Sequence, residues 1–346
     1  MELIALNANF EPVRYIKYTN LQWNRKYYEC GDFSIQMPAS EYDSSMAYIY
    51  STSRPETGII QKVEYEIAYN GKFVQISGFF LERILWDKII YPTYYASGNI
   101  EDDARAIVDR HKEDIPLLRL GEKHNLGTSV VWQETGGEIG SVLYSRLQTQ
   151  QLSQRCRYVF KDNAIYYEVW QGLDRTQDQF ENNFVVFSTT FRNLQDAIVT
   201  TDNSNYKNFF VVAGSGEGAD RVFVEVDLSN GGYKRKLFVD QKGMTYNGSE
   251  QSLDEYKQSL YQKGVETALD YVDTFNVEVT AQNTGFIYMQ DYDLGDRCDL
   301  IIDDLNLTFT ARIIEVNEVV KKNQHTIKIV LGDKILTNIQ KSRLQR

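Results

Sequence analysis

The chain has 346 residues, of which 42% are hydrophobic and 25% are charged, and both shares are ordinary for a globular protein of two or three domains. Its 37 basic and 48 acidic residues give a formal net charge of -11, which argues against a general nucleic-acid binder, since such proteins neutralise phosphates with clustered Lys and Arg. Cys30, Cys156 and Cys298 lack any zinc-binding spacing, so buried free thiols in a protein made in a reducing cytoplasm are expected.

The N-terminal stretch MELIALNANFEPVRYIKY has no basic region followed by a long apolar core, so no signal peptide is expected. No run of about 18 apolar residues occurs in the sequence, and no membrane span is expected. Aromatic residues make up 13% of the chain and there are only 5 Pro, a composition that favours β-sheet, where aromatic side chains fit the pleated surface.

Residues 1–95 are expected to form a first small β-barrel or sandwich domain. Short segments rich in β-branched and aromatic residues, with partial alternation, predict about six strands there. Asn70 and Gly71 separate VEYEIAY from KFVQISGFF, and this dipeptide is the strongest short signal for a hairpin turn. Gly31 and Asp32 form another expected turn, directly before the strand-like stretch FSIQMP.

Residues 96–190 have a different character and predict a mixed α/β domain. One helix is expected in SGNIEDDARAIVDRHKED, with Asn99 as its N-cap and three acidic residues in its first turn. A second helix is expected from Gly140 or Ser141 to about Ser153. The stretch RCRYVFKDNAIYYEVWQG then predicts two strands.

Residues 191–346 predict a second β-barrel domain with a helical insertion at about 250–272. Ser252 and Glu255 have the spacing of a capping box, and an apolar stripe with helical periodicity follows them. Strand-like stretches flank this helix on both sides, and no linker rich in Pro, Gly or Ser separates the three parts of the chain. The predicted fold class is therefore β-rich α+β, with two small barrels and α/β insertions.

The stretch NFFVVAGSGEGADRVFVEV places Gly214, Gly216 and Gly218 after an apolar run, as in many phosphate-binding loops. Such a loop needs a helix after its glycines, because the helix N-terminus holds the phosphate. The residues after Gly218 alternate as a strand does, and the spacing departs from GxGxxG. The three glycines are therefore interpreted as a structural turn between two strands of the second barrel, and no nucleotide cofactor is expected.

The stretch DYDLGDRCDL gathers four aspartates, which raises the question of a calcium site. Gly295 is at the fifth position, a strand follows, and no twelfth-position Glu is present, so the pattern departs from a calcium-binding loop. Gly295 and Asp296 are therefore expected to form a structural turn with solvated carboxylates. The histidines His111, His124 and His325 do not form a metal-binding pattern, and no metal is expected.

No motif of nucleophilic catalysis occurs in the sequence, and no catalytic residue is predicted. With 48 acidic residues, paired carboxylates of a glycosidase type stay open, because nothing singles out any one pair. The residues alone therefore indicate a β-rich, acidic protein with no visible catalytic site.

Several stretches taken together resemble the siphovirus-type phage tail-hub family, also called tail-associated or baseplate-hub proteins. The similar stretches keep the family's order along nearly the whole chain, and they are LQWNRKYYECGDFSIQMP, GKFVQISGFFLERIL, EDDARAIVD, FSTTFRNLQD, YKNFFVVAGSGEGADRVFVEV and YDLGDRCDLIIDD. The family is related in fold to the hubs of contractile tails and to type VI secretion spikes.

This resemblance implies a homotrimer in which two barrels per chain form a ring of six. Such a ring adapts a six-fold tail tube to a three-fold tip and lets DNA pass through its lumen without specific binding. The implied partners are the distal tail or tube protein, the tape measure protein and tip or fibre proteins, and the implied location is the virion tail. The charge of -11 agrees with an acidic lumen that repels phosphate.

Two other function classes stay open at this point. Some members of the family carry peptidase or glycosidase modules that digest the cell wall, usually as C-terminal extensions. This chain has little sequence after its last predicted strands, so the expectation is that it is not an enzyme. The third class is a tail protein that binds carbohydrate on the host surface.

Overall fold

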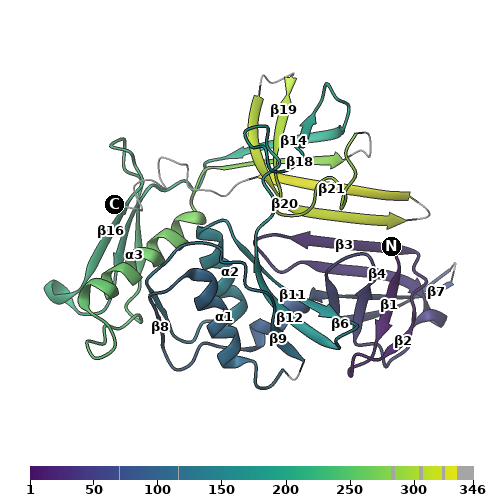
Figure 1. Ribbon diagram of the computed structural model, residues 1–346, viewed down its shortest axis with the longest axis horizontal. Coiled ribbons are helices and arrows are strands. Elements are labelled where there is room, and N and C mark those ends of the chain that lie inside the picture. The colour runs from purple at the N-terminus through teal and green to yellow at the C-terminus, as the bar shows by residue number, and fades with distance from the viewer. Residues whose placement is uncertain (70, 116, 282–284, 304–306, 322–323, 333–346) are drawn as a thin grey trace.

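The computed structural model describes residues 1–346 except 70, 116, 282–284, 304–306, 322–323 and 333–346. The described chain has much more strand than helix, as expected, and its longest helices are α1 (Ile100–His111), α2 (Ile139–Thr149) and α3 (Leu253–Leu269). Figure 1 shows the N-terminal strands and the C-terminal strands on one side of the molecule, with the three helices grouped on the other.

The largest sheet draws strands from both ends of the chain. Its N-terminal strands are β1 (Leu3–Leu6), β2 (Pro12–Tyr15), β3 (Asn20–Lys26), β4 (Asp32–Pro38), β5 (Tyr48–Ser51), β6 (Thr57–Ala68) and β7 (Gly71–Phe80). Its C-terminal strands are β13 (Val186–Ser188), β14 (Leu194–Asp202), β18 (Thr274–Ala281), β19 (Arg297–Ile302), β20 (Leu307–Lys321) and β21 (Gln324–Gly332). Paired strands follow the order β14-β18-β21-β20-β3-β4-β7-β6-β5-β1-β2, while β19 pairs with both β20 and β13.

The N-terminal strands enclose one hydrophobic core. Alternate residues of β3 and β4 point into it, because successive side chains of a strand lie on opposite faces. Leu21 and Trp23 from β3 meet Phe33 and Ile35 from β4, and all four are fully or almost fully buried. The second core lies under β18 to β21 and includes Tyr27, the residue that follows β3.

Closed barrels are not found in the strand pairing of the described residues. The order of the large sheet ends at β14 on one side and at β2 on the other, and these two strands do not pair. The two β blocks are instead joined edge to edge through β20 and β3. The division of the chain near residues 95 and 190 stays a prediction.

The middle of the chain forms a smaller α/β layer around a third core. This part contains η2 (Leu81–Asp87), β8 (Tyr94–Ala96), β9 (Leu118–Leu120), β10 (Trp132–Glu134), β11 (Ser153–Val159) and β12 (Ala164–Trp170). The side chain of Asn99 caps α1 as expected, since its Oδ1 accepts a hydrogen bond of 2.9 Å from the backbone N of Glu101. Helix α2 ends at Thr149, before the predicted end near Ser153, because Gln151 has a φ of 61° and β11 begins at Ser153.

A separate three-stranded sheet contains the glycine-rich stretch. It consists of β15 (Phe209–Ala213), β16 (Phe223–Asp227) and β17 (Lys236–Asp240), in the order β16-β15-β17. The predicted hairpin is confirmed, since β15 and β16 pair antiparallel. Its predicted place in the second barrel is wrong, because α3 packs on this sheet and closes a separate core around Phe210, Val226 and Tyr256.

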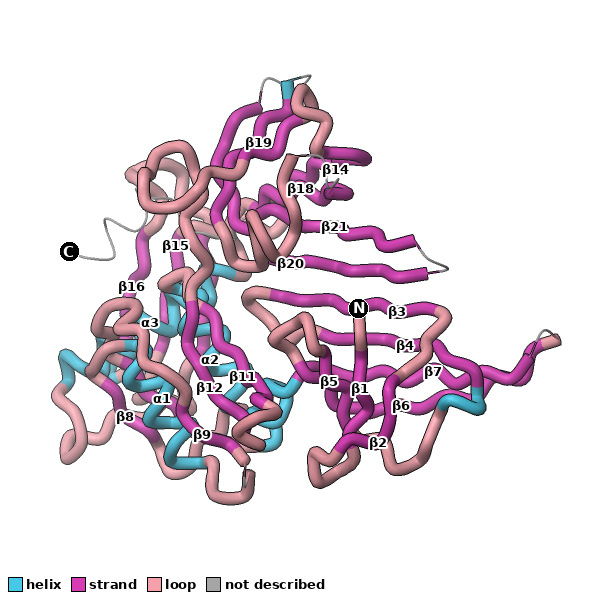
Figure 2. The backbone as a smooth tube through the Cα atoms, turned by 45° about the vertical axis from the view of Figure 1, so that its right-hand side comes forward, coloured by secondary structure: helices cyan, strands magenta, loops and turns pink. Residues whose placement is uncertain are grey.

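Two long hairpins point in the same direction from the joined sheet. The hairpin of β6 and β7 and the hairpin of β20 and β21 both extend toward one end of the molecule, as Figures 1 and 2 show. Ala68 pairs with Gly71, so the connection between β6 and β7 consists of residues 69–70 and Gly71 is the first residue of β7. Gly71 has a φ of 147°, and Asn70 lies outside the described residues.

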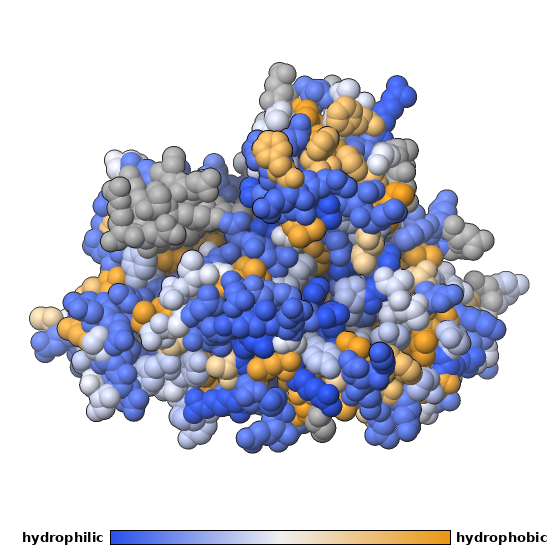
Figure 3. Space-filling view, in the orientation of Figure 1, coloured by the Kyte–Doolittle hydropathy of each residue, from blue (hydrophilic) through white to orange (hydrophobic). Residues whose placement is uncertain are grey.

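The face of the molecule seen in Figure 3 is mostly hydrophilic, with hydrophobic side chains in small scattered groups. None of the helices in the described part of the chain has the length and apolar character that crossing a membrane requires.

Candidate functional site: the seam between the two β blocks

Strands β20 and β3 form the seam that joins the two β blocks into one sheet. The antiparallel pairing runs from Glu315 opposite Lys26 to Lys321 opposite Asn20. Because these residues lie almost 300 positions apart in the sequence, the seam is a purely tertiary feature. Each block therefore covers an edge that the other block would otherwise expose.

One face of the joined sheet is polar across several neighbouring strands. On β3 the residues of this face are Asn20, Gln22 and Asn24, which alternate with the buried Leu21 and Trp23. The residues opposite or beside them in register are mostly polar, with Val319 opposite Gln22 as the apolar exception: Asp32, Ser34, Gln36, Gln75, Ser77, Asn317, Lys321, Thr326 and Lys328. Amide and hydroxyl side chains therefore run across the seam from one block to the other.

Cross-strand hydrogen bonds connect these polar side chains. Gln75 Nε2 donates to Ser34 Oγ over 2.9 Å, and Asn24 Nδ2 donates to Asp32 Oδ2 over 3.2 Å. Charges of both signs are present in the same rows, with Lys328 Nζ at 3.4 Å from Glu278 Oε1. The face is therefore hydrophilic and of mixed charge, and it has no concentration of basic side chains.

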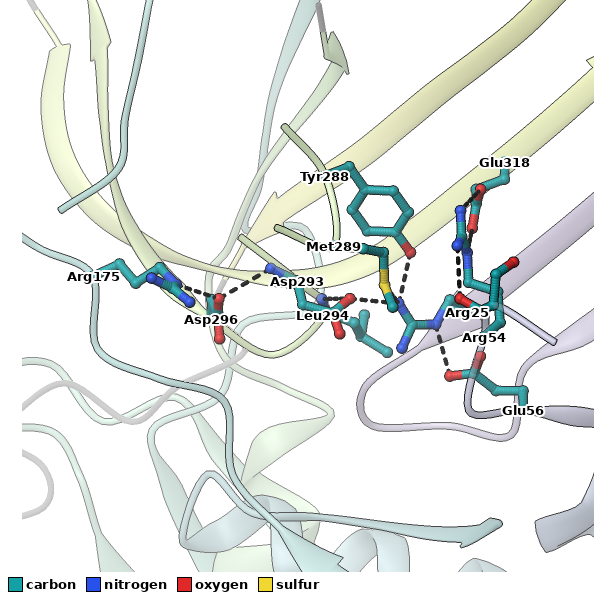
Figure 4. A network of polar contacts seen from close by, with 11 residues as sticks. Arg25, Arg54, Glu56, Arg175, Tyr288, Met289, Asp293, Leu294, Asp296 and Glu318 are labelled. Carbon is teal, nitrogen blue, oxygen red and sulfur yellow. Dashed lines mark hydrogen bonds and ion pairs between the residues drawn. The ribbon is translucent and has the colours of Figure 1, made fainter. Parts of the chain in front are cut away.

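A network of buried ion pairs holds the other side of the seam together, as Figure 4 shows. Arg25 of β3 has a side chain that is only 2% exposed, and its guanidinium lies 2.7 Å from Glu56 and 2.5 Å from Asp293. The hydroxyl of Tyr288 accepts a further hydrogen bond from Arg25 over 2.6 Å. Burial alone would lower the pKa of Arg25, but Glu56, Tyr288 and Asp293 raise it well above the ordinary value.

Glu318 of β20 lies at the centre of a second set of ion pairs. Its fully buried carboxylate accepts two hydrogen bonds of 2.6 Å from Arg54 and one of 3.0 Å from His325. Burial raises the pKa of Glu318, but the hydrogen bonds from Arg54 and His325 outweigh it and bring the pKa down to about 2. Arg54 also lies 5.3 Å from the ring centre of Tyr288, which links the two sets.

Asp296 and Gly295 lie in a turn that fastens the loop after β12 to the second block. Asp296 accepts hydrogen bonds of 2.7 Å from the backbone N of Leu173 and from Arg175 Nε. The expected solvated carboxylate is wrong for Asp296, which is only 3% exposed. Burial raises the pKa of Asp296, and the hydrogen bond from Arg175 opposes that rise. Gly295 has a φ of 86°, and a Cβ on Gly172 would come within 2.0 Å of its carbonyl carbon, so the two backbones approach closely.

The other aspartates of this stretch also have protein partners and do not converge on one point. Asp291 accepts a hydrogen bond from the backbone N of Ile287, Asp293 pairs with Arg25, and Asp299 accepts from the backbone N of Gln177. No group of His, Cys, Asp and Glu in the described ranges has the geometry of a metal site.

Gly31 and Asp32 lie where β3 turns into β4. A Cβ on Gly31 would come within 2.5 Å of the carbonyl oxygen of Asn24 and 2.6 Å of the Phe80 ring. The Gly31 carbonyl accepts a hydrogen bond of 3.0 Å from Phe80 N, and Asp32 pairs with Asn24 as the first residue of β4. This turn therefore allows β3, β4 and the end of β7 to pack closely.

Gly214, Gly216 and Gly218 lie in the turn between β15 and β16, and in the described chain no α-helix directly follows them that could bind a phosphate at its N-terminus. Only a short 3-10 turn, Gly218–Asp220, precedes β16. Gly216 and Gly218 have φ values of 102° and 55°, and a Cβ on Gly214 would lie 2.3 Å from the hydroxyl of Tyr256. Arg221 forms an ion pair with Asp240 at the end of this turn.

The ion-pair network of the seam was not predicted from the sequence. One local signal exists, since Arg25 occupies the third buried position of a strand after Leu21 and Trp23, where an apolar residue is the norm. Its partners come from positions 56, 288 and 293, and no sequence pattern connects them to β3.

A comparison with protein families identifies the chain. The family model described as siphovirus ReqiPepy6 Gp37-like protein matches residues 13–333. The chain belongs to this family. The expected resemblance to siphovirus tail proteins is thereby confirmed, whereas a search of curated proteins gave no match.

Solved structures share the fold of this Gp37-like protein at low sequence identity. The tail protein from Neisseria meningitidis MC58 has a TM-score of 0.60 at 12% identity, and the comparison covers 96% of both chains. The 43 kDa tail protein of prophage MuSo2 from Shewanella oneidensis has a TM-score of 0.61 at 10% identity, with 96% of this chain and 99% of the other covered.

A third solved structure is the prophage tail protein gp18 from Listeria monocytogenes EGD-e. It has a TM-score of 0.58 at 10% identity, with 100% of this chain and 99% of the other covered. At such identities the likeness establishes the fold alone. The described part of the Gp37-like chain therefore has the fold of these phage tail proteins.

Proposed function

We propose that this protein is a structural hub of a phage tail or of a prophage-derived, tail-like particle. Three copies form a ring with six-fold pseudo-symmetry between the tail tube and the tail tip, and DNA passes through the lumen. The protein is located in the virion tail and acts without a cofactor. Membership of a siphovirus family and the tail-protein fold support this proposal.

The observation that carries the proposal is the seam of β20 and β3. It fixes two β blocks side by side in each chain, so a three-fold ring of chains contains six such blocks. A ring of six blocks made by three chains matches a six-fold tube on one side and a three-fold tip on the other. The partners of this proposal are the distal tail or tube protein, the tape measure protein and tip or fibre proteins.

The polar face of the joined sheet is the surface that we assign to the lumen. Passing DNA would meet amide and hydroxyl side chains and charges of both signs, such as Lys328 beside Glu278. Tight binding of DNA needs several Lys and Arg aligned with phosphates, and the paired carboxylates weaken that attraction. Such a wall lets DNA slide without being held.

The proposal is tested by measuring the mass of the purified protein by light scattering and by imaging it in negative stain. The expected result is a trimer that appears as a ring. A monomer that also fails to join a reconstituted tail tip would overturn the hub proposal.

Two further assays separate the hub from the other function classes that the sequence left open. Clearing of peptidoglycan in a zymogram by the purified protein would assign a cell-wall hydrolase instead of a purely structural protein. Specific hits on a glycan array, together with a monomeric protein, would favour a carbohydrate-binding tail protein.

A further inference from the structure

The loop between β12 and β13 is braced by its own side chains. Gln179 Nε2 donates hydrogen bonds to the carbonyl oxygens of Thr176 and Asn182 over 3.0 and 2.8 Å. Asn182 Nδ2 donates to the carbonyl oxygen of Asp174 over 3.1 Å, and the backbone N of Gln177 donates to Asp299 of β19 over 2.9 Å. The loop therefore has a defined shape before any partner binds.

This braced loop displays Phe180 with its side chain fully exposed, at 100% of its reference surface. The neighbouring acidic residues Asp178 and Glu181 are exposed as well. Aromatic residues held in a fixed position are the common anchors of protein interfaces, because little conformational entropy is lost when they bind. Phe180 thus has the properties of a knob that fits a hollow with aromatic walls, a polar rim and a cation beside it.

The chain carries a hollow of this kind on other elements. It has a volume of about 460 Å³ and lies between the end of β7, η2, α2 and α3. Its aromatic lining consists of Tyr28, Phe79, Trp86 and Tyr144. The volume exceeds that of one phenylalanine side chain, so a single ring can enter.

Arg83 supplies the cation beside the hollow. Its guanidinium lies 5.3 Å from the ring centres of both Phe79 and Trp86. Lys26 belongs to the lining itself and lies 3.4 Å from Glu29. Arg83 is therefore preorganised between two rings, with its hydrogen-bond donors available to an incoming carboxylate.

Three carboxylates line the hollow, and Glu29 among them is paired with Lys26, so the other two set the orientation of the incoming loop. Glu266 and Asp270 come from the α3 wall, and Glu266 already pairs with Arg146 over 2.9 Å. Arg83 comes from the η2 wall. An acidic loop entering the hollow is therefore attracted to the η2 side and repelled from Asp270.

We infer that Phe180 of one copy of this chain inserts into the hollow between η2, α2 and α3 of the next copy, with Asp178 or Glu181 pairing with Arg83. The inference rests on the proposed trimer and names the surfaces that would build it. Knob and hollow are different surfaces of the chain, so the contact is head-to-tail, and repeated head-to-tail contacts close into a ring when the rotation permits it.

The first test is the substitution Phe180→Ala in the full-length protein, with self-association measured by analytical ultracentrifugation. The expected result is a dissociation constant at least 10-fold higher than that of the natural protein. Phe191→Ala is the matched control, since Phe191 is 60% exposed on a different loop, and it leaves association unchanged. Both side chains are exposed, so circular dichroism should show an unaltered fold.

The second test exchanges the charges. Arg83→Glu is expected to weaken association, and the combination of Arg83→Glu with Asp178→Arg and Glu181→Arg is expected to restore it. A direct contact is tested by joining Phe180→Cys and Ser145→Cys variants with a short bismaleimide, since the native cysteines are buried. The expected product is a covalent dimer formed between the two variants.

Failure of this inference can be told apart from failure of the hub proposal. If the natural protein forms a trimer that Phe180→Ala leaves intact, and no cross-link forms, the knob-and-hollow contact is wrong and the hub proposal stands. If the natural protein neither associates nor cross-links at any concentration, the contact is also wrong. Incorporation into a reconstituted tail tip then decides on the hub separately.

Discussion

Glu318 and Glu82 are both buried carboxyl groups, but their surroundings move the pKa in opposite directions. Glu318 accepts hydrogen bonds from Arg54 and His325 and has a pKa of about 2. Burial raises the pKa of Glu82 to about 8, the charge of Glu56 adds to this rise, and backbone hydrogen bonds oppose it only in part. The two residues should therefore give the stability of the protein opposite pH dependences.

Glu318 stabilises the folded state above the ordinary carboxyl pKa, and this contribution is lost as the pH falls from about 4.5 toward 2. Between about pH 5 and pH 3 the natural protein should lose roughly 2 kcal/mol of unfolding free energy through this residue. The variant Glu318→Gln should lose less unfolding free energy over this pH range, as measured by urea unfolding. Equal losses of unfolding free energy in the two proteins would contradict the assignment. The control Glu64→Gln removes an exposed ion pair and should show the same pH dependence as the natural protein.

Glu82 favours the folded state when it is protonated, so its contribution is present below about pH 4.5 and is lost as the pH rises toward 8. Between about pH 5 and pH 8 this residue should cost roughly 3 kcal/mol of unfolding free energy. Glu82→Gln removes the ionisable group, so the variant should be more stable than the natural protein at pH 8. An unchanged difference between the two proteins at pH 5 and pH 8 would show that Glu82 does not titrate as described.

At the scale of elements, the glycine-rich turn before β16 is a packing device. Gly214 lies against α3, where the Tyr256 hydroxyl donates to the Met244 carbonyl over 2.6 Å and accepts from the backbone N of Ser215 over 2.7 Å. These hydrogen bonds fasten the small sheet to the helix. Sequence reasoning identified the turn correctly but not the helix that it contacts.

Gly214→Ala should therefore destabilise the protein, because the new methyl group would lie 2.3 Å from the Tyr256 oxygen and 2.7 Å from Leu260. Overpacking of this kind costs about 1–3 kcal/mol. Gly243→Ala is the control, since no atom lies within 4 Å of a Cβ built there. Thermal unfolding of both variants measures the difference, and equal melting temperatures would be the contradictory result.

The elements themselves were largely predictable from local patterns. The N-cap Asn99, the capping box of Ser252 and Glu255, and the β15–β16 hairpin all follow from a few neighbouring residues, and the structure shows each of them. The end of α2 and the residues connecting β6 and β7 differ from expectation by a few positions. The backbone conformation of Gln151 determines where α2 ends, and the strand register at Gly71 determines where β7 begins. No local sequence motif predicts either feature.

At the scale of the whole molecule, the polar face of the joined sheet makes a prediction about DNA. Replacing Gln22, Ser34 and Gln75 by Lys places three positive charges on three neighbouring strands of that face. Each aligned cation that meets a phosphate releases counterions, so the triple variant should bind double-stranded DNA in a salt-dependent way. The natural protein should show no such binding in an electrophoretic mobility-shift assay at the same ionic strength.

A matched control places three lysines at exposed neutral positions away from the joined sheet, at Ser129, Thr245 and Ser249, so that both variants gain the same three charges. If this control binds DNA as strongly as the triple variant of the sheet, net charge alone explains the effect and the assignment of the lumen fails. Blocked DNA ejection from particles that carry only the sheet variant would support the assignment.

The sequence by itself determined the class of this protein, the presence of most of its strands and helices, and its family. Those features depend on periodicity, caps and turn residues, which act between neighbours in the chain. Only the tertiary structure decided that β20 pairs with β3, that Arg25 meets Asp293, and that the glycine-rich hairpin lies under α3 and outside the large sheet. These contacts join residues that are 41 positions apart for Ser215 and Tyr256 and 268 apart for Arg25 and Asp293. They depend on how complete faces fit together, which no local pattern encodes.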